Sequence, residues 1–260
     1  DWASVNIPVY QPAGWSHFHL PGSINAWRRC KSRRKWLRIH RDFEWPDTYT
    51  PENLEDLKRF YDRYLKDIHN GWEMTPKVRV DVMDAFDLDH AERRPETSFP
   101  LERTQYKKLY LNAADTSLQT TPVETESQIS YDGNTGKVEF DMAFDEDTEL
   151  TGYMYLRLYV EADGHDDMDL FVNIQKADAS GRWIPWFTLN EPHPGAWGKM
   201  RVSRRELDEK LSTKFCPVLA QKRELKLSKG EIVPVDIAIS WPRTSAAMPV
   251  CSRARWTRWS

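Results

Sequence analysis

The sequence predicts an α/β unit followed by a β-sandwich, and three observations carry this prediction. From residue 5 to residue 71, short apolar runs alternate with helical segments, an order typical of a parallel sheet covered by helices. After Pro76 the pattern changes to longer segments in which apolar and polar residues alternate. Turn signals such as DGNTG at residues 132–136 separate some of these segments, as they do in a β-sandwich.

The first unit is expected to contain two buried strands, each followed by a helix. The runs VNIPVYQPAG (5–14) and KWLRIH (35–40) have the apolar character of parallel strands, and GSINAWRRC (22–30) has one apolar helical face. A second helix begins at TPE (50–52), where an N-cap residue precedes proline and an acidic residue. The predicted apolar stripe of this helix consists of Leu54, Leu57, Tyr61, Tyr64, Leu65 and Ile68.

The second unit is expected to be a sandwich with one short helix. Its strands are expected within residues 77–84, 107–113, 127–144, 149–162, 168–178 and 231–240. The segment SRRELDEKL (203–211) predicts the helix, because Ser203 and Glu206 have the spacing of a capping box. The expected domains are therefore residues 1–73 and 74–245, followed by an unstructured tail, 246–260, which has no strand or helix period.

Composition excludes several classes of protein. The chain has 260 residues, a net charge of −3 and 40% hydrophobic residues, which predicts a globular protein that binds neither nucleic acid nor membrane. Three cysteines without a CxxC pair suggest neither a disulfide framework nor a zinc site. No apolar run is long enough for a membrane span and no signal peptide is evident. We therefore expect a reducing, cytoplasmic compartment, and no cofactor.

The stretch AGWSHFHLPGS (13–23) resembles the nucleophile elbow of a hydrolase. The elbow pattern is G-x-S-x-G, and Gly14 and Ser16 occupy its first two fixed positions. Phe18 stands where the second glycine is required, and a bulky side chain there would separate the strand and helix backbones. No serine in this chain has both glycines, so Ser16 is expected to be a strand-end loop residue and not a nucleophile.

Two sets of histidines are candidates for chemistry. His17 and His19 place two imidazoles on one side of an extended segment, but no carboxylate or cysteine is near them in sequence, so no metal site is expected. His40 ends the run KWLRIH, and α/β sheets place their chemistry just past the carboxyl ends of strands. From position alone, His40 is either a catalytic histidine or a surface-loop residue.

Two further features have a plain structural interpretation beside a functional one. Four aspartates between Asp163 and Asp169 suggest calcium, but they lack the ligand spacing of an EF-hand, and a solvated hairpin turn is the preferred interpretation. Trp183, Trp186 and Trp197 can form a sugar-stacking platform or pack within the sheets.

Several stretches together resemble the X-Pro dipeptidyl-peptidase and cocaine-esterase family of α/β-hydrolases. They are IPVYQPAGWS, KWLRIH with FEWPDTY, FYDRYLKDIHNGW, TPKVRVDV, the segment from GKVEF to KADASG, GKMRVSRRELDEK and LSKGEIVPVDIAI. The resemblance runs from Ile7 to Pro242. It implies the C-terminal end of an α/β-hydrolase sheet, followed by a non-catalytic, galactose-binding-like jelly roll that TPKVRVDV opens.

The resemblance also implies site residues. The family's triad aspartate falls at His17, and its catalytic histidine falls after the KWLRIH strand, which makes His40 the candidate; Asp42 or Asp47 can replace the missing carboxylate. The family's serine lies upstream, on an elbow that this chain does not contain. The tail also departs from the family pattern, so we expect a truncated or misjoined gene product.

Three functions follow as alternatives. The intact protein is expected to be a serine hydrolase, a dipeptidyl-peptidase or acyl esterase, that acts on a small ester or X-Pro peptide through Ser-His-Asp chemistry. These 260 residues alone are expected to be inactive. The second alternative is a non-catalytic jelly-roll module that binds a saccharide or packs on a hydrolase partner, and the third is a chain with no function.

Overall fold

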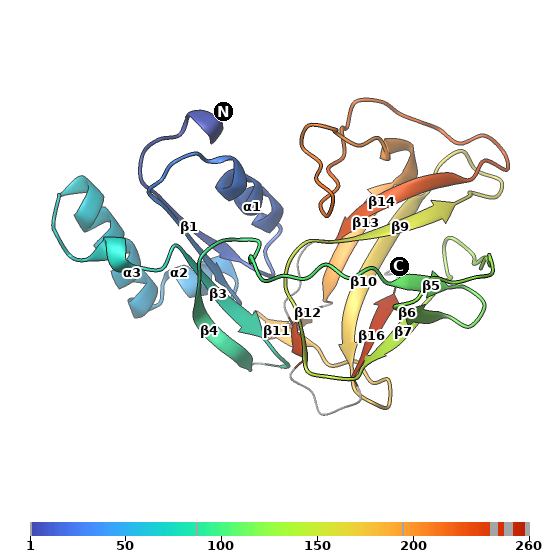
Figure 1. The fold of residues 1–260 in the computed structure, drawn as a ribbon, viewed down its shortest axis with the longest axis horizontal. Helices are drawn as coiled ribbons and strands as arrows, with labels where there is room; N and C mark the ends of the chain where they lie inside the picture. The colour runs from blue at the N-terminus through green and yellow to red at the C-terminus, as the bar shows by residue number, and fades with distance from the viewer. Residues whose placement is uncertain (1, 87, 194, 240–243, 247–251, 258–260) are drawn as a thin grey trace. The chain divides into compact units, whose positions relative to one another are not determined.

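The computed structural model describes the chain except residues 1, 87, 194, 240–243, 247–251 and 258–260 (Figure 1). Contacts divide the chain into two compact units. The first unit comprises Asp1–Arg103, Trp186–His193 and Arg243–Ser245, and the second comprises Thr104–Pro185, Pro194–Pro242 and Ala246–Ser260. Within the described residues, no helix has both the length and the apolar character needed to cross a bilayer.

The first unit is built on a four-stranded sheet with the order β1-β2-β3-β4. Strands β1, β2 and β3 are parallel, and β4 pairs with β3 in the antiparallel sense. Helices carry the chain between the parallel strands (Figure 1). The elements are η1 (Trp2–Ser4), β1 (Val9–Gly14), α1 (Leu20–Arg29), β2 (Lys35–His40), α2 (Glu44–Thr48), α3 (Pro51–Leu65), η2 (Trp72–Met74), β3 (Val78–Met83), β4 (Asp89–Glu96), β11 (Trp186–Thr188) and β12 (Glu191–His193).

Strand β3 belongs to this sheet, whereas its alternating sequence predicts the first strand of the sandwich. Leu37 of β2 pairs with Val78 of β3. The polar residues that create the alternation are not solvated: Arg79 is buried against the Asp56 carboxylate at 2.6 Å, and Asp81 accepts the backbone N–H of Arg41 at 3.1 Å. The alternation of apolar and polar residues predicts a strand with one solvated face, but both faces of β3 are largely buried.

Helix α3 starts as expected but buries a different face. The hydroxyl of Thr50 accepts the N–H of Asn53 at 3.3 Å, and proline opens the helix. The buried residues are Asn53, Asp56, Phe60 and Asp62, while most of the predicted apolar stripe is exposed, with Leu65 at 76%. Phe60 packs with Trp36 and Trp72, and Asp56 is buried because Arg79 and Tyr10 satisfy its carboxylate.

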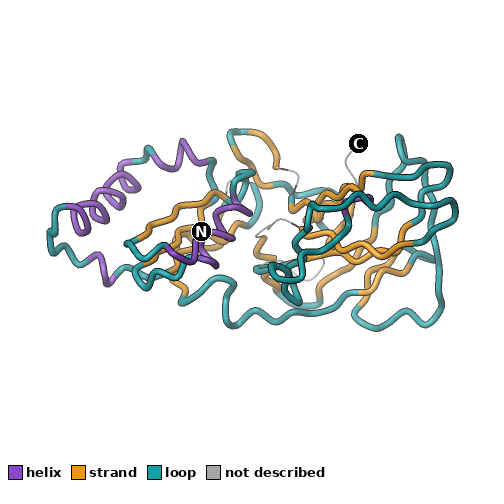
Figure 2. The backbone as a smooth tube through the Cα atoms, turned by 90° about the horizontal axis from the view of Figure 1, so that it is seen from above, coloured by secondary structure: helices purple, strands orange, loops and turns teal. Residues whose placement is uncertain are grey.

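The second unit is rich in β-structure. One sheet has the order β13-β10-β16-β7-β6-β5, and β9 pairs with β14. A core cluster forms between β10 and β13 on one side and β9 and β14 on the other. Figure 2 shows the strands in orange and the loops that connect them in teal. Its elements are β5 (Tyr110–Asn112), β6 (Ser117–Gln119), β7 (Phe140–Phe144), β8 (Thr148–Leu150), β9 (Met154–Val160), β10 (Asp169–Ala177), β13 (Ala196–Arg201), η3 (Val202–Arg204), β14 (Val233–Ile239) and β16 (Ser252–Thr257); β15 (Thr244–Ala246) spans the two units.

Three local predictions differ from the structure. The turn at residues 132–136 forms, but the five residues before it make no strand, so the expected hairpin has only its second strand, β7. The expected helix at 203–211 is reduced to the single turn η3, because Asp167 accepts the N–H of Ser203 and Glu206 pairs with Arg223. Residues 252–257, in the segment expected to be unstructured, form β16; residues 247–251 and 258–260 lie outside the described residues.

Candidate functional site

The candidate site lies at the carboxyl ends of β1 and β2. These strands are parallel and in register, with Gly14 opposite His40, so the segments that follow them leave the sheet at the same edge. Gly14 is closely packed, because a Cβ would lie 3.0 Å from the Asp42 carbonyl oxygen and 3.3 Å from the His40 ring. The sequence thus brings residues 15–19 and 41–47 together.

His17 and Glu44 form a histidine–carboxylate pair at this edge. Nδ1 of His17 lies 3.1 Å from Oε1 of Glu44, and the His17 side chain is 2% exposed. The imidazole stacks on Phe18 at a centroid distance of 4.2 Å and packs against Phe43 at 4.6 Å. Two aromatic rings therefore hold the imidazole beside one carboxylate oxygen.

Both neutral tautomers of His17 have a partner. With its proton on Nδ1, the ring donates to Glu44; with its proton on Nε2, Nδ1 accepts the backbone N–H of His19 at 3.1 Å. Burial lowers the pKa of His17, and the Glu44 carboxylate opposes that shift. His17 is accordingly neutral at pH 7 and has the protonation state of a general base.

His40 lies in a different environment at the end of β2. Its side chain is 1% exposed, and Nδ1 lies 3.0 Å from the Asp42 carbonyl oxygen and 3.3 Å from Oδ1 of Asp47. Burial lowers the pKa of His40 to about 4, even though Asp47 acts in the opposite direction. Asp47 is itself held by both terminal nitrogens of Arg38, one of them at 2.8 Å. His40 thus belongs to a buried polar network.

The carboxylate that lies beside His17 was not among the candidates that the sequence suggested. Asp42 is about half exposed and lies 3.5 Å from Arg41, and Asp47 is committed to Arg38. Glu44 instead begins helix α2 and reaches His17. Its position in the loop directly after a strand was the signal that could have identified it.

The hydroxyl of Ser16 lies 3.0 Å from the hydroxyl of Thr188, which β11 supplies within the same unit. This contact joins the loop after β1 to the β11–β12 hairpin. The assignment of Ser16 as a loop residue without a nucleophilic role stays a prediction.

In the acidic segment from Asp163 to Asp169, aspartates pair with basic side chains of the second unit. Asp169 pairs with Arg201 at 2.8 Å, and Lys226 lies 3.5 Å from Asp166. Asp167 accepts the backbone N–H of Ser203 at 2.9 Å. These contacts account for three of its four aspartates without calcium.

The three tryptophans proposed as a sugar platform do not lie in one unit. Trp186 belongs to the first unit, whereas Trp183 and Trp197 belong to the second. Trp186 is 3% exposed and stacks on His193 at a centroid distance of 4.6 Å, so it offers no free face to a sugar.

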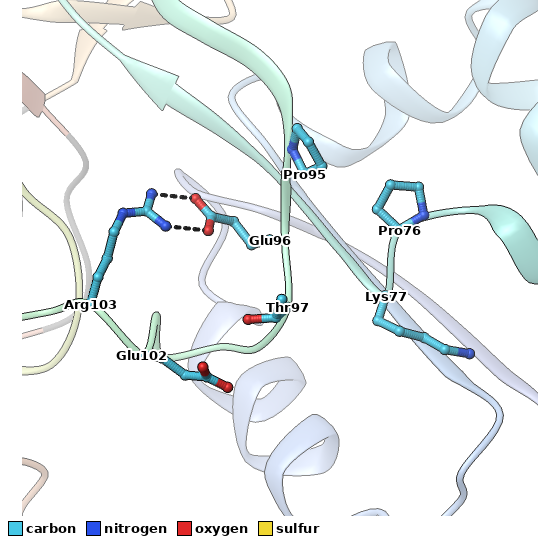
Figure 3. A pocket seen from close by; sticks show the side chains of 7 residues that line it. All are labelled: Pro76, Lys77, Pro95, Glu96, Thr97, Glu102 and Arg103. Carbon is cyan, nitrogen blue, oxygen red and sulfur yellow. Dashed lines mark hydrogen bonds and ion pairs between the residues drawn. The ribbon is translucent and has the colours of Figure 1, made fainter.

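A hollow in the first unit is lined by charged side chains, two of which form an ion pair. Its charged residues are Lys77, Glu96, Glu102 and Arg103, and Arg103 donates two hydrogen bonds to Glu96 (Figure 3). Arg94 donates to the same carboxylate at 2.8 Å, and Arg103 holds the pKa of Glu96 below its usual range. This carboxylate serves an ion-pair network.

Comparisons with known proteins identify the family of the chain. The profile of the X-Pro dipeptidyl-peptidase C-terminal non-catalytic domain matches residues 70–243. The chain belongs to this family. No curated protein matches it.

Solved structures extend the likeness over nearly the whole chain. A CocE/NonD family hydrolase from Staphylococcus aureus has a TM-score of 0.92 and 36% identity over 98% of this chain and 46% of that chain. A second structure described as a CocE/NonD family hydrolase from the same organism has a TM-score of 0.89 and 37% identity, over 96% of this chain and 46% of that one. An aminopeptidase from a Thaumarchaeota archaeon, at 14% identity and a TM-score of 0.62 over 97% of this chain and 47% of that chain, shares the fold alone. The chain spans about half the length of these relatives.

Proposed function

We propose that the intact protein is a serine hydrolase that acts by acyl transfer on a small ester or an X-Pro amide. In this proposal, His17 and Glu44 are the histidine and the carboxylate of its triad. The observation that carries the proposal is the 3.1 Å contact between these side chains at the carboxyl edge of parallel strands. The likeness to CocE/NonD family hydrolases supports the class of reaction.

The two residue types have exchanged places relative to the family resemblance. That resemblance puts an aspartate after the first strand, at His17, and a histidine after the second. In this chain the histidine follows β1 and the carboxylate, Glu44, follows β2. Because the two loops leave the same edge of the sheet, an exchange of the two side chains preserves the pair.

The pair can perform both steps that a triad requires. With Nδ1–H donating to Glu44, Nε2 of His17 is free to accept the proton of an attacking serine. The Glu44 carboxylate then stabilises the imidazolium, and Nε2 returns the proton to the leaving group. We assign the serine and the oxyanion donors to a segment outside these 260 residues.

The same proposal covers the finer architecture and the role of His40. The parallel sheet of the first unit is the C-terminal part of an α/β-hydrolase sheet, and the second unit is a galactose-binding-like jelly roll. His40 then supports the loop that carries Glu44, because it contacts Asp42 and Asp47 on either side of that residue. It is a positioning residue in place of the catalytic histidine first expected.

A fluorophosphonate probe, which labels activated serines, tests where the nucleophile lies. The 260-residue chain is expected to stay unlabelled, and a version extended at its N-terminus to the length of the relatives is expected to be labelled. Ser16→Ala in the extended protein is expected to label like the wild type, at a stability cost of about 1 kcal/mol for the lost Thr188 contact. Labelling of the short chain that disappears in Ser16→Ala would overturn the assignment.

A further inference from the structure

A third ligand-type side chain stands beside the proposed catalytic pair. His19 is 61% exposed, and its Nδ1 lies 3.7 Å from Oε2 of Glu44. One ligand atom each from His17, His19 and Glu44 falls within 4.8 Å of the others. The carboxylate that the sequence around His17 and His19 lacked is thus supplied by helix α2.

The three groups match a zinc ligand set in type. Zn²⁺ is bound by imidazole nitrogens and carboxylate oxygens, and open sites use three protein ligands, two histidines and one glutamate among the known combinations. Donors about 2.0–2.1 Å from a tetrahedral ion lie about 3.3 Å apart. Nδ1 of His17 and Nδ1 of His19 lie 3.1 Å and 3.7 Å from different carboxylate oxygens of Glu44. All three ligand atoms lie within 4.8 Å of one another, so side-chain rotation is needed to bring them to one ion.

We propose that His17, His19 and Glu44 bind Zn²⁺ and that the bound ion inhibits the hydrolase. The binding half of this proposal is independent of the proposed function, and the inhibition half rests on it. A neutral imidazole has one proton. When Nδ1 of His17 binds the ion, that proton resides on Nε2, and Nε2 can no longer accept a proton from serine. The ion also occupies the Glu44 carboxylate.

The environment makes this a reversible site. Nδ1 of His17 must give up the backbone N–H of His19, now at 3.1 Å, which reduces the net free energy of binding. The exposed ring of His19 gives the ion a path from solvent. The site therefore suits an inhibitory ion that binds and leaves more readily than a structural one.

Isothermal titration of the 260-residue chain with ZnCl₂ tests the binding half. Wild type is expected to bind one ion at this site, and His19→Gln is expected to weaken that binding at least about tenfold, the loss associated with disturbing a metal site. His165→Gln, at an exposed histidine of the second unit, is the matched control and is expected to bind like wild type. A Cys216→Ser, Cys251→Ser background leaves Cys30, which is buried, as the remaining thiol.

The binding half is overturned if wild type in that background binds no ion, or if His19→Gln binds as tightly as wild type. A Co²⁺ spectrum with nitrogen and oxygen ligation but no thiolate charge-transfer band supports the assignment, and a thiolate band contradicts it.

Ester hydrolysis by the N-terminally extended protein tests the inhibition half. Zn²⁺ is expected to inhibit wild type, a chelator is expected to reverse the inhibition, and His19→Gln is expected to keep basal activity while losing sensitivity to zinc. Equal inhibition of wild type and His19→Gln, or activation by zinc, overturns this half. If the extended protein has no activity at all, the proposed function fails, and the titration alone decides the site.

Discussion

His17 lies in the loop after β1 and His40 ends β2, at the same edge of the sheet, and each lies beside a carboxylate. The Nδ1–carboxylate distances are similar, 3.1 Å to Glu44 and 3.3 Å to Asp47. The surroundings differ: Glu44 is 30% exposed, whereas Asp47 is 8% exposed and held by Arg38. The Nδ1–carboxylate distance therefore does not distinguish the two pairs, which differ in the exposure and in the other partners of the carboxylate.

This comparison predicts that substitution of His17 lowers activity, whereas substitution of His40 lowers stability. His17→Gln in the N-terminally extended protein is expected to lower kcat/KM for an activated ester by about 10²–10⁴-fold, the usual loss for a general base, with little change in Tm. His40→Gln is expected to lower Tm and to retain most of the activity at a temperature where the variant is folded. A steady-state assay and a thermal melt on both variants distinguish them. Loss of chemistry in His40→Gln alone would reverse the assignment.

The buried network is expected to lose stability when its carboxylate is removed. Asp47→Asn leaves the Arg38 guanidinium buried without its ion-pair partner, which costs about 3–5 kcal/mol. The free energy of unfolding from urea denaturation measures this loss. The matched control is Asp236→Asn in the second unit, whose partner Arg157 is 56% exposed; such pairs are worth about 0.2–1 kcal/mol. Equal losses in the two variants would contradict a difference based on burial.

Acid is expected to weaken the His40 network. The folded-state pKa of His40 is lowered to about 4 from 6.5, so the unfolded chain binds more protons between these values and stability falls as pH falls from about 6.5 to 4. The His40 contribution lost below pH 4 is about 3 kcal/mol, since one pKa unit corresponds to about 1.4 kcal/mol. Urea denaturation at pH 7.5 and pH 4.5 measures it as the difference between wild type and His40→Gln. A variant with the same pH dependence as wild type would contradict it.

Sequence patterns predicted the general order of elements better than the identity of the site. The strands that end at Gly14 and His40, and the helix that starts at Pro51, were expected because periodicity and capping are local properties. The burial of Arg79 and Asp56 could not be predicted from local pattern, because each charge is buried only where the other neutralises it. The same holds for Glu44, which becomes a partner of His17 only when β1 and β2 pair in register.

The β-rich unit illustrates the same limit. Alternation predicted β9 and β14, and their residues alternate in burial as expected. The expected helix after Ser203 does not form beyond one turn. Asp167 accepts the backbone N–H of Ser203, and Arg223 donates to the Glu206 carboxylate, so neither group is available for the predicted capping box. Local signals failed where a more distant polar partner competed for the same donor or acceptor.

The most direct test of the central claim is to restore the family order of the pair. In the N-terminally extended protein, His17→Asp and Glu44→His are each expected to lower kcat/KM by about 10²–10⁴-fold, because each breaks the pair formed by His17 and Glu44. The double variant contains the pair again, in exchanged positions, and is expected to recover at least about tenfold over either single variant. A double variant no more active than the single ones, while still folded by thermal melt, would contradict the claim that His17 and Glu44 form the catalytic pair.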